Sequence, residues 1–197
     1  ISWLSNRKGT MPAENRVILQ RAGIIDPSSV EDYIAQDGYM ALGKVIQEMD
    51  SKQVIKELTD SGLRGRGGAG FPTGLKLRFV ASTPGEKKYV ICNADESEPG
   101  TFKDRVILEG DPFSILEAMT IAAYTIGADE GYIYVRGEYH LAQERLKNAI
   151  EKAEAYGVLG NNIFGSDFNF HIHVHSGAGA YICGEETALI ESIEGKR

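Results

Sequence analysis

The segment best suited to ligand chemistry is a glycine-rich stretch at 62–76, which reads GLRGRGGAGFPTGLK. Backbone that carries no side chain can approach a phosphate or a flat ring closely, and its N–H groups can hydrogen-bond such a ligand. Arg64, Arg66 and Lys76 add positive charge to the same stretch. The residue types therefore predict a wall that binds a nucleotide or a related anionic ligand.

The spacing of these glycines gives weaker support, although Gly65, Gly67 and Gly70 satisfy the dinucleotide pattern G-x-G-x-x-G. That pattern needs a strand before it and a helix after it, whereas here a helix is expected before the glycines. The alternative is a flexible linker. Phe71 and Phe79 argue against a linker, because aromatic rings are suited to stacking on a flat ligand.

A second candidate segment is the acidic loop NADESEPG at 93–100, which follows the first predicted strand. In α/β sheets the ligand crevice lies outside the carboxyl ends of the strands, which is where this loop falls. A plain turn is the alternative, because Asn, Asp, Pro and Gly form turns and carboxylates are usually solvated. Taken alone, the loop favours the turn.

The third segment, GAGAYICGEET at 177–187, comes directly after the last predicted strand and opens a helix. A helix N-terminus offers N–H donors to a ligand, and Glu185 and Glu186 could accept hydrogen bonds from the hydroxyls of a ribityl chain or a ribose. The alternative is that both carboxylates only stabilise the helix dipole. Three such loops at one edge of a sheet predict a binding site more strongly than each does separately.

The histidines and cysteines do not predict a metal site. His171, His173 and His175 alternate along one predicted strand, and neighbouring pairs could share an ion, but the outer two lie ~13 Å apart at strand rise. A half-solvated strand face is the favoured interpretation. Cys92 and Cys183 are too few for a disulfide framework or a four-thiolate cluster, and we expect small buried apolar residues there, although both lie beside predicted ligand loops.

Alternating strands and helices must position these segments. Strand patterns at 89–92, 132–135 and 170–174 are separated by helix patterns at 111–126 and 138–156. Strands joined by helices of that length form right-handed crossovers in a parallel sheet. The predicted fold class is α/β, a Rossmann-like parallel sheet flanked by helices, with a helical N-terminal segment.

The N-terminal segment is predicted to hold three helices. Pro27 is expected at the first helical position of a helix that includes Val30. Apolar residues at 39–49 repeat at helical spacing, and a third helix runs from about Lys52 to a stop at Gly62.

This pattern predicts how the chain is divided. We expect residues 1–61 to form a helical segment packed on an α/β domain of residues 62–197, which closes with a helix at 183–193. The chain begins with Ile and ends on a helical pattern with no closing element, so we expect a fragment of a longer polypeptide.

Composition excludes several classes of partner. The chain has 197 residues, 42% of them hydrophobic, and a formal net charge of -7. This balance does not provide the basic field that nucleic acid or an anionic membrane requires. No secretory signal or membrane-spanning run is visible, so we expect no direct membrane insertion. The predicted location is cytoplasmic, with the inner face of a membrane complex as a peripheral alternative.

Three motifs carry a resemblance to a known family: GRGGAGFPTGLK at 65–76, NADESEPGTFKDR at 93–105 and GAGAYICGEETALIESIEG at 177–195. In this order they resemble the NADH-binding flavoprotein subunit of complex I. The same family includes the diaphorase subunits of NAD-linked hydrogenases and formate dehydrogenases.

The resemblance implies FMN as resident cofactor and NAD(H) as substrate. The residues that it places around FMN are Gly65, Arg66, Gly67, Gly68, Lys76, Asn93, Asp95, Glu96, Tyr181, Gly184 and Glu185. The residues that it places toward NADH are Ala69, Phe71, Phe79, Glu98 and Glu186, with both phenylalanines near the adenine. Gly70 completes the cofactor-binding set, Glu98 is the candidate catalytic residue, and no metal ligand is assigned.

A reaction and protein partners are also implied by the resemblance. Hydride would pass between NADH and FMN, and electrons would then move singly to iron–sulfur clusters. The complete subunit of the family continues into a ubiquitin-like domain and a helical bundle that holds a 4Fe–4S cluster, and we expect both to be missing here. The implied partners are a thioredoxin-like 2Fe–2S subunit and a larger iron–sulfur subunit. A non-catalytic nucleotide-binding or scaffold module is the alternative function.

Overall fold

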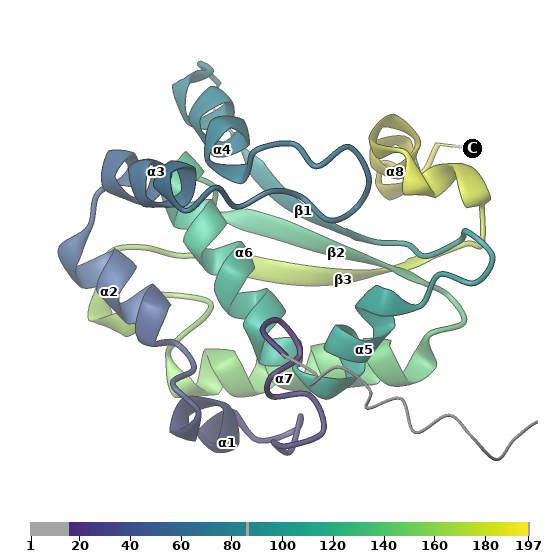
Figure 1. The fold of residues 1–197 in the computed structure, drawn as a ribbon, viewed down its shortest axis with the longest axis horizontal. Helices are drawn as coiled ribbons and strands as arrows, with labels where there is room; N and C mark the ends of the chain where they lie inside the picture. The colour runs from purple at the N-terminus through teal and green to yellow at the C-terminus, as the bar shows by residue number, and fades with distance from the viewer. Residues whose placement is uncertain (1–15, 86, 197) are drawn as a thin grey trace, which may run out of the picture.

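The structure, a computed structural model, describes residues 16–85 and 87–196. At the centre of this part of the chain lies a parallel sheet with the strand order β1-β2-β3 (Figure 1). The strands are β1 (Tyr89–Ala94), β2 (Glu130–Arg136) and β3 (His171–Gly177). The helices are α1 (Val30–Ala35), α2 (Met40–Glu48), α3 (Ser51–Asp60), α4 (Thr73–Ser82), α5 (Lys103–Gly110), α6 (Pro112–Ile126), α7 (His140–Tyr156) and α8 (Glu186–Ile193). The predicted α/β class and the β-α-β-α-β order are confirmed.

The two long connections, α6 and α7, begin and end at residues with a clear local reason. Pro112 opens α6 at the first helical position, where its missing N–H costs no hydrogen bond. Gly127 and Gly157 end α6 and α7 with φ values of 74° and 81°, a left-handed conformation that a residue with a Cβ adopts at a cost.

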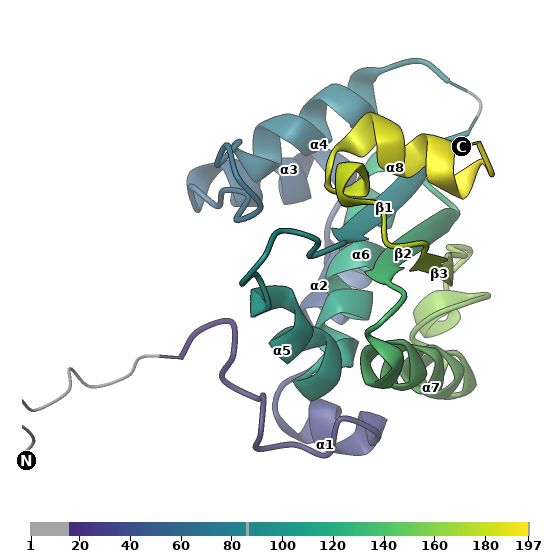
Figure 2. The ribbon, with the colours of Figure 1, turned by 90° about the vertical axis from the view of Figure 1, so that its right-hand side faces the viewer.

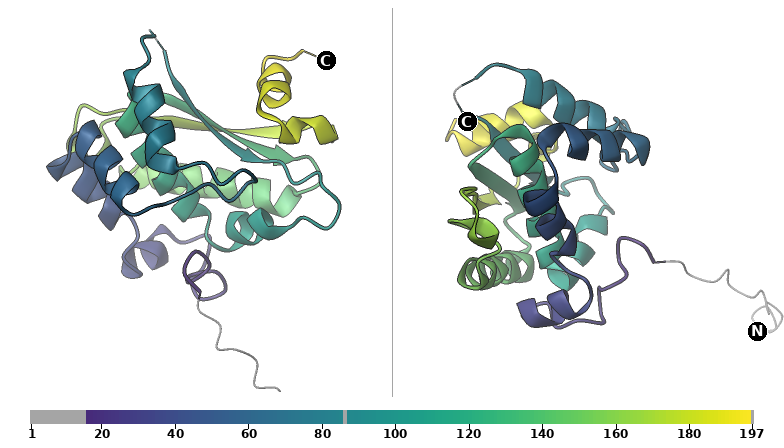
Figure 3. Two further views of the ribbon diagram at one scale, coloured as in Figure 1. Left: turned by 45° about the horizontal axis from the view of Figure 1, so that its top comes forward. Right: turned by 90° about the vertical axis from the view of Figure 1, so that its left-hand side faces the viewer.

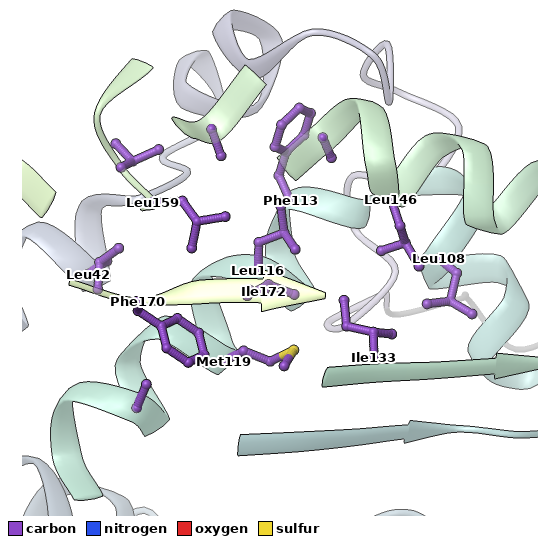
Figure 4. Close-up of a cluster of buried hydrophobic side chains, with 14 of the residues drawn as sticks. Leu42, Leu108, Phe113, Leu116, Met119, Ile133, Leu146, Leu159, Phe170 and Ile172 are labelled. Carbon is purple, nitrogen blue, oxygen red and sulfur yellow. The ribbon is translucent and has the colours of Figure 1, made fainter. Parts of the chain in front are cut away.

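One face of the sheet is covered by α6 and α7, and the main core lies between these helices and the strands. Phe113 and Leu116 of α6, Leu146 of α7, Ile133 of β2 and Phe170 just before β3 are all fully buried there (Figure 4). Burial of such side chains contributes about 1.5–3 kcal/mol each. The core therefore fixes the sheet from one side and leaves its carboxyl ends free for a site.

The opposite face of the sheet carries α8 (Figure 2). Tyr134 points to this face, because side chains alternate along β2 and its neighbours Ile133 and Val135 belong to the main core. Leu189 of α8 packs on Tyr134, and the Tyr134 hydroxyl lies 3.0 Å from Oγ of Ser192. This contact holds α8 near the end of the sheet where the third predicted loop lies.

A buried carboxylate joins the N-terminal helices to the core. Both oxygens of Glu117, on α6, are occupied: the Tyr33 hydroxyl donates to it at 2.5 Å, and the N–H groups of Tyr39 and Leu42 donate at 3.0 Å each. The last two donors belong to the first turn of α2, so a side chain of another helix caps α2. Helices α1 and α2 are thus hydrogen-bonded into the α/β core.

Four details differ from the sequence predictions. Helices α4 and α5 were not predicted. Pro27 precedes the helix rather than opening it, because Ser29 is the N-cap and its Oγ accepts the Asp32 N–H at 3.0 Å. The last predicted helix divides, because the extended backbone of Glu185 separates a 3-10 turn at Tyr181–Gly184 from α8.

Candidate functional site

Three loops meet at the carboxyl ends of the strands and enclose a cavity of about 730 Å³. They are the glycine-rich loop between α3 and α4, the acidic loop after β1 and the segment between β3 and α8 (Figure 3, left). The cavity is lined by Arg66, Gly67, Asn93, Asp95, Glu96, Ser97, Glu98, Thr101, Lys103, Asp104, Tyr181, Ile182, Gly184 and Glu185. The expectation that these segments share one edge of the sheet is confirmed.

A second cavity of about 580 Å³ adjoins the first, and Asn93, Gly184 and Glu185 line both. Lys76 of α4 and Glu186 of α8 line this second cavity. Between the two cavities, the Asn93 side-chain amide donates to the Gly184 carbonyl at 3.0 Å. This hydrogen bond ties the end of β1 to the segment before α8 and makes the two cavities parts of one site.

The glycine-rich loop folds back on itself. The Gly65 N–H donates to the Phe71 carbonyl at 3.0 Å, and the Arg64 guanidinium donates to the Gly70 carbonyl at 3.0 Å. Gly68 and Gly70 have φ values of 152° and 64°, which glycine adopts at little cost. Since a helix stands on either side of this loop, it is not the strand-turn-helix unit that the dinucleotide pattern requires.

Arg66 and Gly67 are the residues of this loop that line the first cavity. A Cβ placed on Gly67 would meet no other atom within 4 Å, and the same holds for Gly184 on the opposite wall. The space beside these two glycines is therefore open, and bare backbone is what a flat or phosphorylated ligand would meet there.

In the acidic loop, hydrogen bonds fix two carboxylates beside the cavity. The Asn93 side-chain oxygen accepts the Asp95 N–H at 3.1 Å, and the Ser97 hydroxyl donates to the Asp95 carboxylate at 2.8 Å. The Tyr181 hydroxyl donates to the Glu98 carboxylate across the cavity, and this hydrogen bond raises the pKa of Tyr181. Asp95 and Glu98 thus present acceptors to a ligand with hydroxyl groups.

Glu96 behaves differently from its neighbours. Its side chain is 2% exposed, and its carboxylate accepts the N–H groups of Asp104 and Arg105 at 2.9 and 3.1 Å and the Tyr139 hydroxyl at 3.3 Å. The resemblance placed Glu96 around FMN, but its carboxylate is occupied by donors of the protein itself. Only the backbone of Glu96 is left to contact a ligand.

The two glutamates before and at the start of α8 have separate environments. Glu185 accepts the N–H groups of Thr187 and Ala188 at 3.0 and 3.1 Å, and these hydrogen bonds lower the pKa of its carboxyl. Glu185 therefore stabilises the start of α8, as the alternative interpretation expected for both glutamates. Glu186 is exposed, and its place in the second cavity leaves it available to a ligand.

Comparison with known proteins identifies the family to which the chain belongs. The model of the Nuo51 FMN-binding domain matches residues 58–197, which include all three loops. The chain belongs to this family.

The relatives of this chain include subunits of NADH-quinone oxidoreductases and of a hydrogenase. The chain is 51% identical to an F subunit of NADH-quinone oxidoreductase from Rhizobium meliloti, a match that covers 92% of this chain and 43% of that protein. It is 54% identical to the HndC component of the NADP-reducing hydrogenase of Solidesulfovibrio fructosivorans, a match that covers 92% and 37% respectively. The chain therefore spans less than half the length of these relatives.

Solved structures show the same fold. An NAD+-reducing nickel–iron hydrogenase in its air-oxidised state superposes with a TM-score of 0.70 and 38% identity, over 93% of this chain and 28% of that one. The hydrogen-reduced state of such an enzyme gives a TM-score of 0.67 and 46% identity, over 75% and 25%.

Most but not all of the predicted site residues line one of the two cavities. Outside both linings lie Gly65, Gly68, Ala69, Gly70, Phe71 and Phe79. The side chains of Phe71 and Phe79 are 47% and 53% exposed, which leaves both rings open to a ligand. In the first cavity the prediction missed five lining residues, all inside the quoted motifs: Ser97, Thr101, Lys103, Asp104 and Ile182. In the second cavity it missed Tyr89, Ile91, Leu189 and Ile190, of which the first two precede the second motif.

Two of the three histidines of β3 lie against tyrosines of β2, one pair tilted and the other stacked. The ring centroids of Tyr132 and His173 lie 5.2 Å apart, as do those of Tyr134 and His175. Among the described residues, no group of three or more His, Cys, Asp or Glu side chains is arranged to hold a metal ion. In the same part of the chain, no helix combines the length and apolarity that crossing a membrane requires.

Cys92 is expected to be chemically inert in the native protein. It packs against the main core, and burial, with a smaller contribution from Asp104, raises the pKa of its thiol to about 11. At pH 8 about one thiol in a thousand is then ionised, so a Cys183→Ser variant should react with an aromatic disulfide reagent about a hundredfold more slowly than free cysteine. Unfolding in urea should restore fast labelling, and fast labelling of the native variant would contradict the raised pKa of the partly buried Cys92 thiol.

Proposed function

We propose that the two adjoining cavities bind FMN and a nicotinamide nucleotide, and that the chain is the FMN- and NAD(H)-binding part of an oxidoreductase subunit. The observation that carries the proposal is the meeting of three loops at one edge of the sheet, where glycine backbone faces a wall of carboxylates and hydroxyls. Membership of the Nuo51 family supports the same ligands.

The residues present fit FMN. Gly67 and Gly184 leave open space beside bare backbone, which a flat ring can approach. Asp95 can accept hydrogen bonds from ribityl hydroxyls, and Arg66 and Lys76 supply positive charge for a phosphate. Bound there, FMN supplies a ring that takes a hydride from a nicotinamide and passes electrons on singly.

The task left to the protein is mainly to orient two flat ligands. We assign Phe71 and Phe79 to stacking on the nucleotide, because both rings are exposed and belong to the glycine-rich loop and the helix that follows it. Glu98 is held toward the cavity by Tyr181 and remains the candidate catalytic residue. Gly65, Gly68, Ala69 and Gly70 complete the proposed cofactor-binding set as the loop that carries these contacts.

The wider assembly is part of the proposal. Electrons would leave for iron–sulfur clusters, including a 4Fe–4S cluster on a part of the polypeptide outside this sequence. The proposed partners are a thioredoxin-like 2Fe–2S subunit and a larger iron–sulfur subunit, since relatives are named as subunits of multi-subunit oxidoreductases. The proposed location is the cytoplasm or the inner face of a membrane complex.

An absorption spectrum tests the function. The full-length subunit, reconstituted with FMN, should show the bands of oxidised flavin and lose them when NADH is added without oxygen. The chain of residues 1–197 should be tested in parallel, because it holds all three loops. A folded full-length protein that stays colourless after reconstitution would favour the non-catalytic scaffold and would overturn the proposed function.

The choice of nicotinamide should depend on Glu186. A carboxylate accepts hydrogen bonds from the ribose hydroxyls of NADH, whereas the 2′-phosphate of NADPH would bring like charge against it. Glu186→Gln removes the repulsion without adding a cation, so the preference for NADH over NADPH should fall by about tenfold or more.

Flavin reduction by each nucleotide in the full-length subunit measures this preference. Glu191→Gln is the matched control, because Glu191 is exposed on the same helix but lines neither cavity. If Glu186→Gln discriminates as strongly as the parent, then Glu186 does not face the adenosine ribose.

A further inference from the structure

One residue of the acidic loop, Glu96, lies at the edge of the cavity but has its carboxylate hydrogen-bonded into the fold. Asp95, Ser97 and Glu98 line the cavity with polar side chains, while the carboxylate of Glu96 between them is buried in the fold. Glu96 also caps α5, because its two oxygens accept the N–H groups of Asp104 and Arg105, and the residue before α5 provides no side-chain cap. The side chain of Glu96 is thus the fixed point of the loop.

Tyr139, at the start of α7, is hydrogen-bonded to the Glu96 side chain. Its hydroxyl donates to the Glu96 carboxylate at 3.3 Å. Two guanidinium groups lie near its ring, that of Arg105 5.1 Å and that of Arg136 5.6 Å from the ring centroid. Burial first, and then the charge of Glu96, raises the pKa of Tyr139, so its hydroxyl remains a donor at neutral pH. The residue is buried and lines neither cavity.

Arg136, the last residue of β2, holds the backbone of the same residue. Its Nη1 donates to the Glu96 carbonyl at 2.8 Å, while its Nε and Nη2 donate to the Glu138 carboxylate at 3.3 and 3.2 Å. Arg136 lines neither cavity either. A planar guanidinium that uses several N–H groups at once has one favoured orientation, which a lysine would not reproduce.

We propose that Arg136 and Tyr139 are positioning residues for the ligand site, which hold the side chain and the carbonyl of Glu96 so that Asp95 and Glu98 face the cavity. This inference rests on the proposed binding of FMN in that cavity. A loop tethered through both its side chain and its backbone at one residue cannot rotate about that residue. The neighbouring carboxylates are therefore kept in place before a ligand arrives, which lowers the entropy cost of binding.

The test uses the full-length subunit with Tyr139→Phe and Arg136→Lys. Tyr139→Phe keeps the ring beside the two arginines and removes only the donor to Glu96. Tyr156→Phe is the matched control, because Tyr156 ends the same helix and its side chain is 54% exposed. The dissociation constant of FMN is measured by quenching of flavin fluorescence in apoprotein, and the environment of bound flavin by visible circular dichroism at saturating FMN.

Both test variants should bind FMN about tenfold more weakly than the parent, since a hydrogen bond to a charged group contributes roughly that factor. Their visible circular dichroism at saturation should also differ from that of the parent, and Tyr156→Phe should match the parent in both measurements. In a double-mutant cycle, adding Tyr139→Phe to Glu96→Ala, which removes both acceptor oxygens, should cost no further FMN affinity, because Tyr139 acts through Glu96.

The outcomes separate this inference from the function on which it rests. A parent protein that binds no FMN would overturn the proposed function. If the parent binds FMN and both variants bind it equally well with the same circular dichroism, the positioning role is wrong, even where melting temperatures have fallen. Additive losses in the double-mutant cycle would likewise overturn the route through Glu96.

Discussion

Gly67→Val should abolish retention of FMN while leaving the protein folded. Gly67 has no positive φ, and a Cβ placed there would meet no protein atom within 4 Å, so valine strains neither the backbone nor the packing. The new side chain would instead occupy the cavity that Gly67 lines. Binding of FMN is lost and folding is not, because the open space that valine fills is the space that a flat ring would use.

Flavin content per protein after gel filtration measures this loss, and far-ultraviolet circular dichroism confirms folding. Gly85→Val is the matched control, because Gly85 also has open space around it and no positive φ, but it lines neither cavity. The control should keep its flavin. A folded Gly67→Val protein with the flavin content of the parent would contradict the assignment of this loop as a ligand wall.

Glu117→Leu should lower the free energy of unfolding by about 3–5 kcal/mol, because it leaves buried donors without an acceptor. Leucine can fill most of the volume, but the N–H groups of Tyr39 and Leu42 and the Tyr33 hydroxyl would lose their shared partner. A buried, unpaired donor costs the full desolvation penalty, and here three are created at once. The first turn of α2 would also lose its cap.

Urea unfolding followed by circular dichroism measures the change. Glu151→Leu is the matched control, because Glu151 is exposed on α7, and its free energy of unfolding should change by less than about 0.5 kcal/mol. A Glu117→Leu protein as stable as this control would show that the N-terminal helices do not depend on the buried carboxylate.

Local pattern was enough to predict the strands but not helix α4. Strands β1 and β2 are runs of β-branched and aromatic residues, which favour a pleated surface. In α4, apolar residues alternate at Leu75, Leu77 and Phe79, which is not a helical period. Gly74 is typical of a loop, yet it is a contact residue: a Cβ there would lie 2.4 Å from Oγ1 of Thr59, so α3 and α4 approach closely only because it is glycine.

Helix α5 was missed for a related reason. The residue before it, Phe102, provides no side-chain cap, so the usual start signal is absent from the local sequence. The capping carboxylate belongs to Glu96, which only the fold brings to the start of α5. The same contact explains why Glu96 could not be told from Asp95 and Glu98 in advance. Their residue types are equivalent in the sequence, and only the burial of the Glu96 side chain distinguishes it from its neighbours.

The convergence of the loops was predictable because it follows from topology rather than from side-chain detail. In a parallel sheet, the segments after β1 and β3 must emerge at the same edge. The exact lining was not predictable, because α5 brings Lys103 and Asp104 into the cavity and α5 itself was not anticipated.

The segments that form the two walls of the cavity are far apart in the sequence, so the ribosome makes them at different times. The glycine-rich loop is complete by residue 72, whereas the opposite wall begins at Tyr181. At roughly 5–20 residues per second, a ribosome needs about 5–20 s to cover that interval. Helices α6 and α7 are translated before the last wall exists, so the complete cavity is available to a ligand only after this whole region has been made.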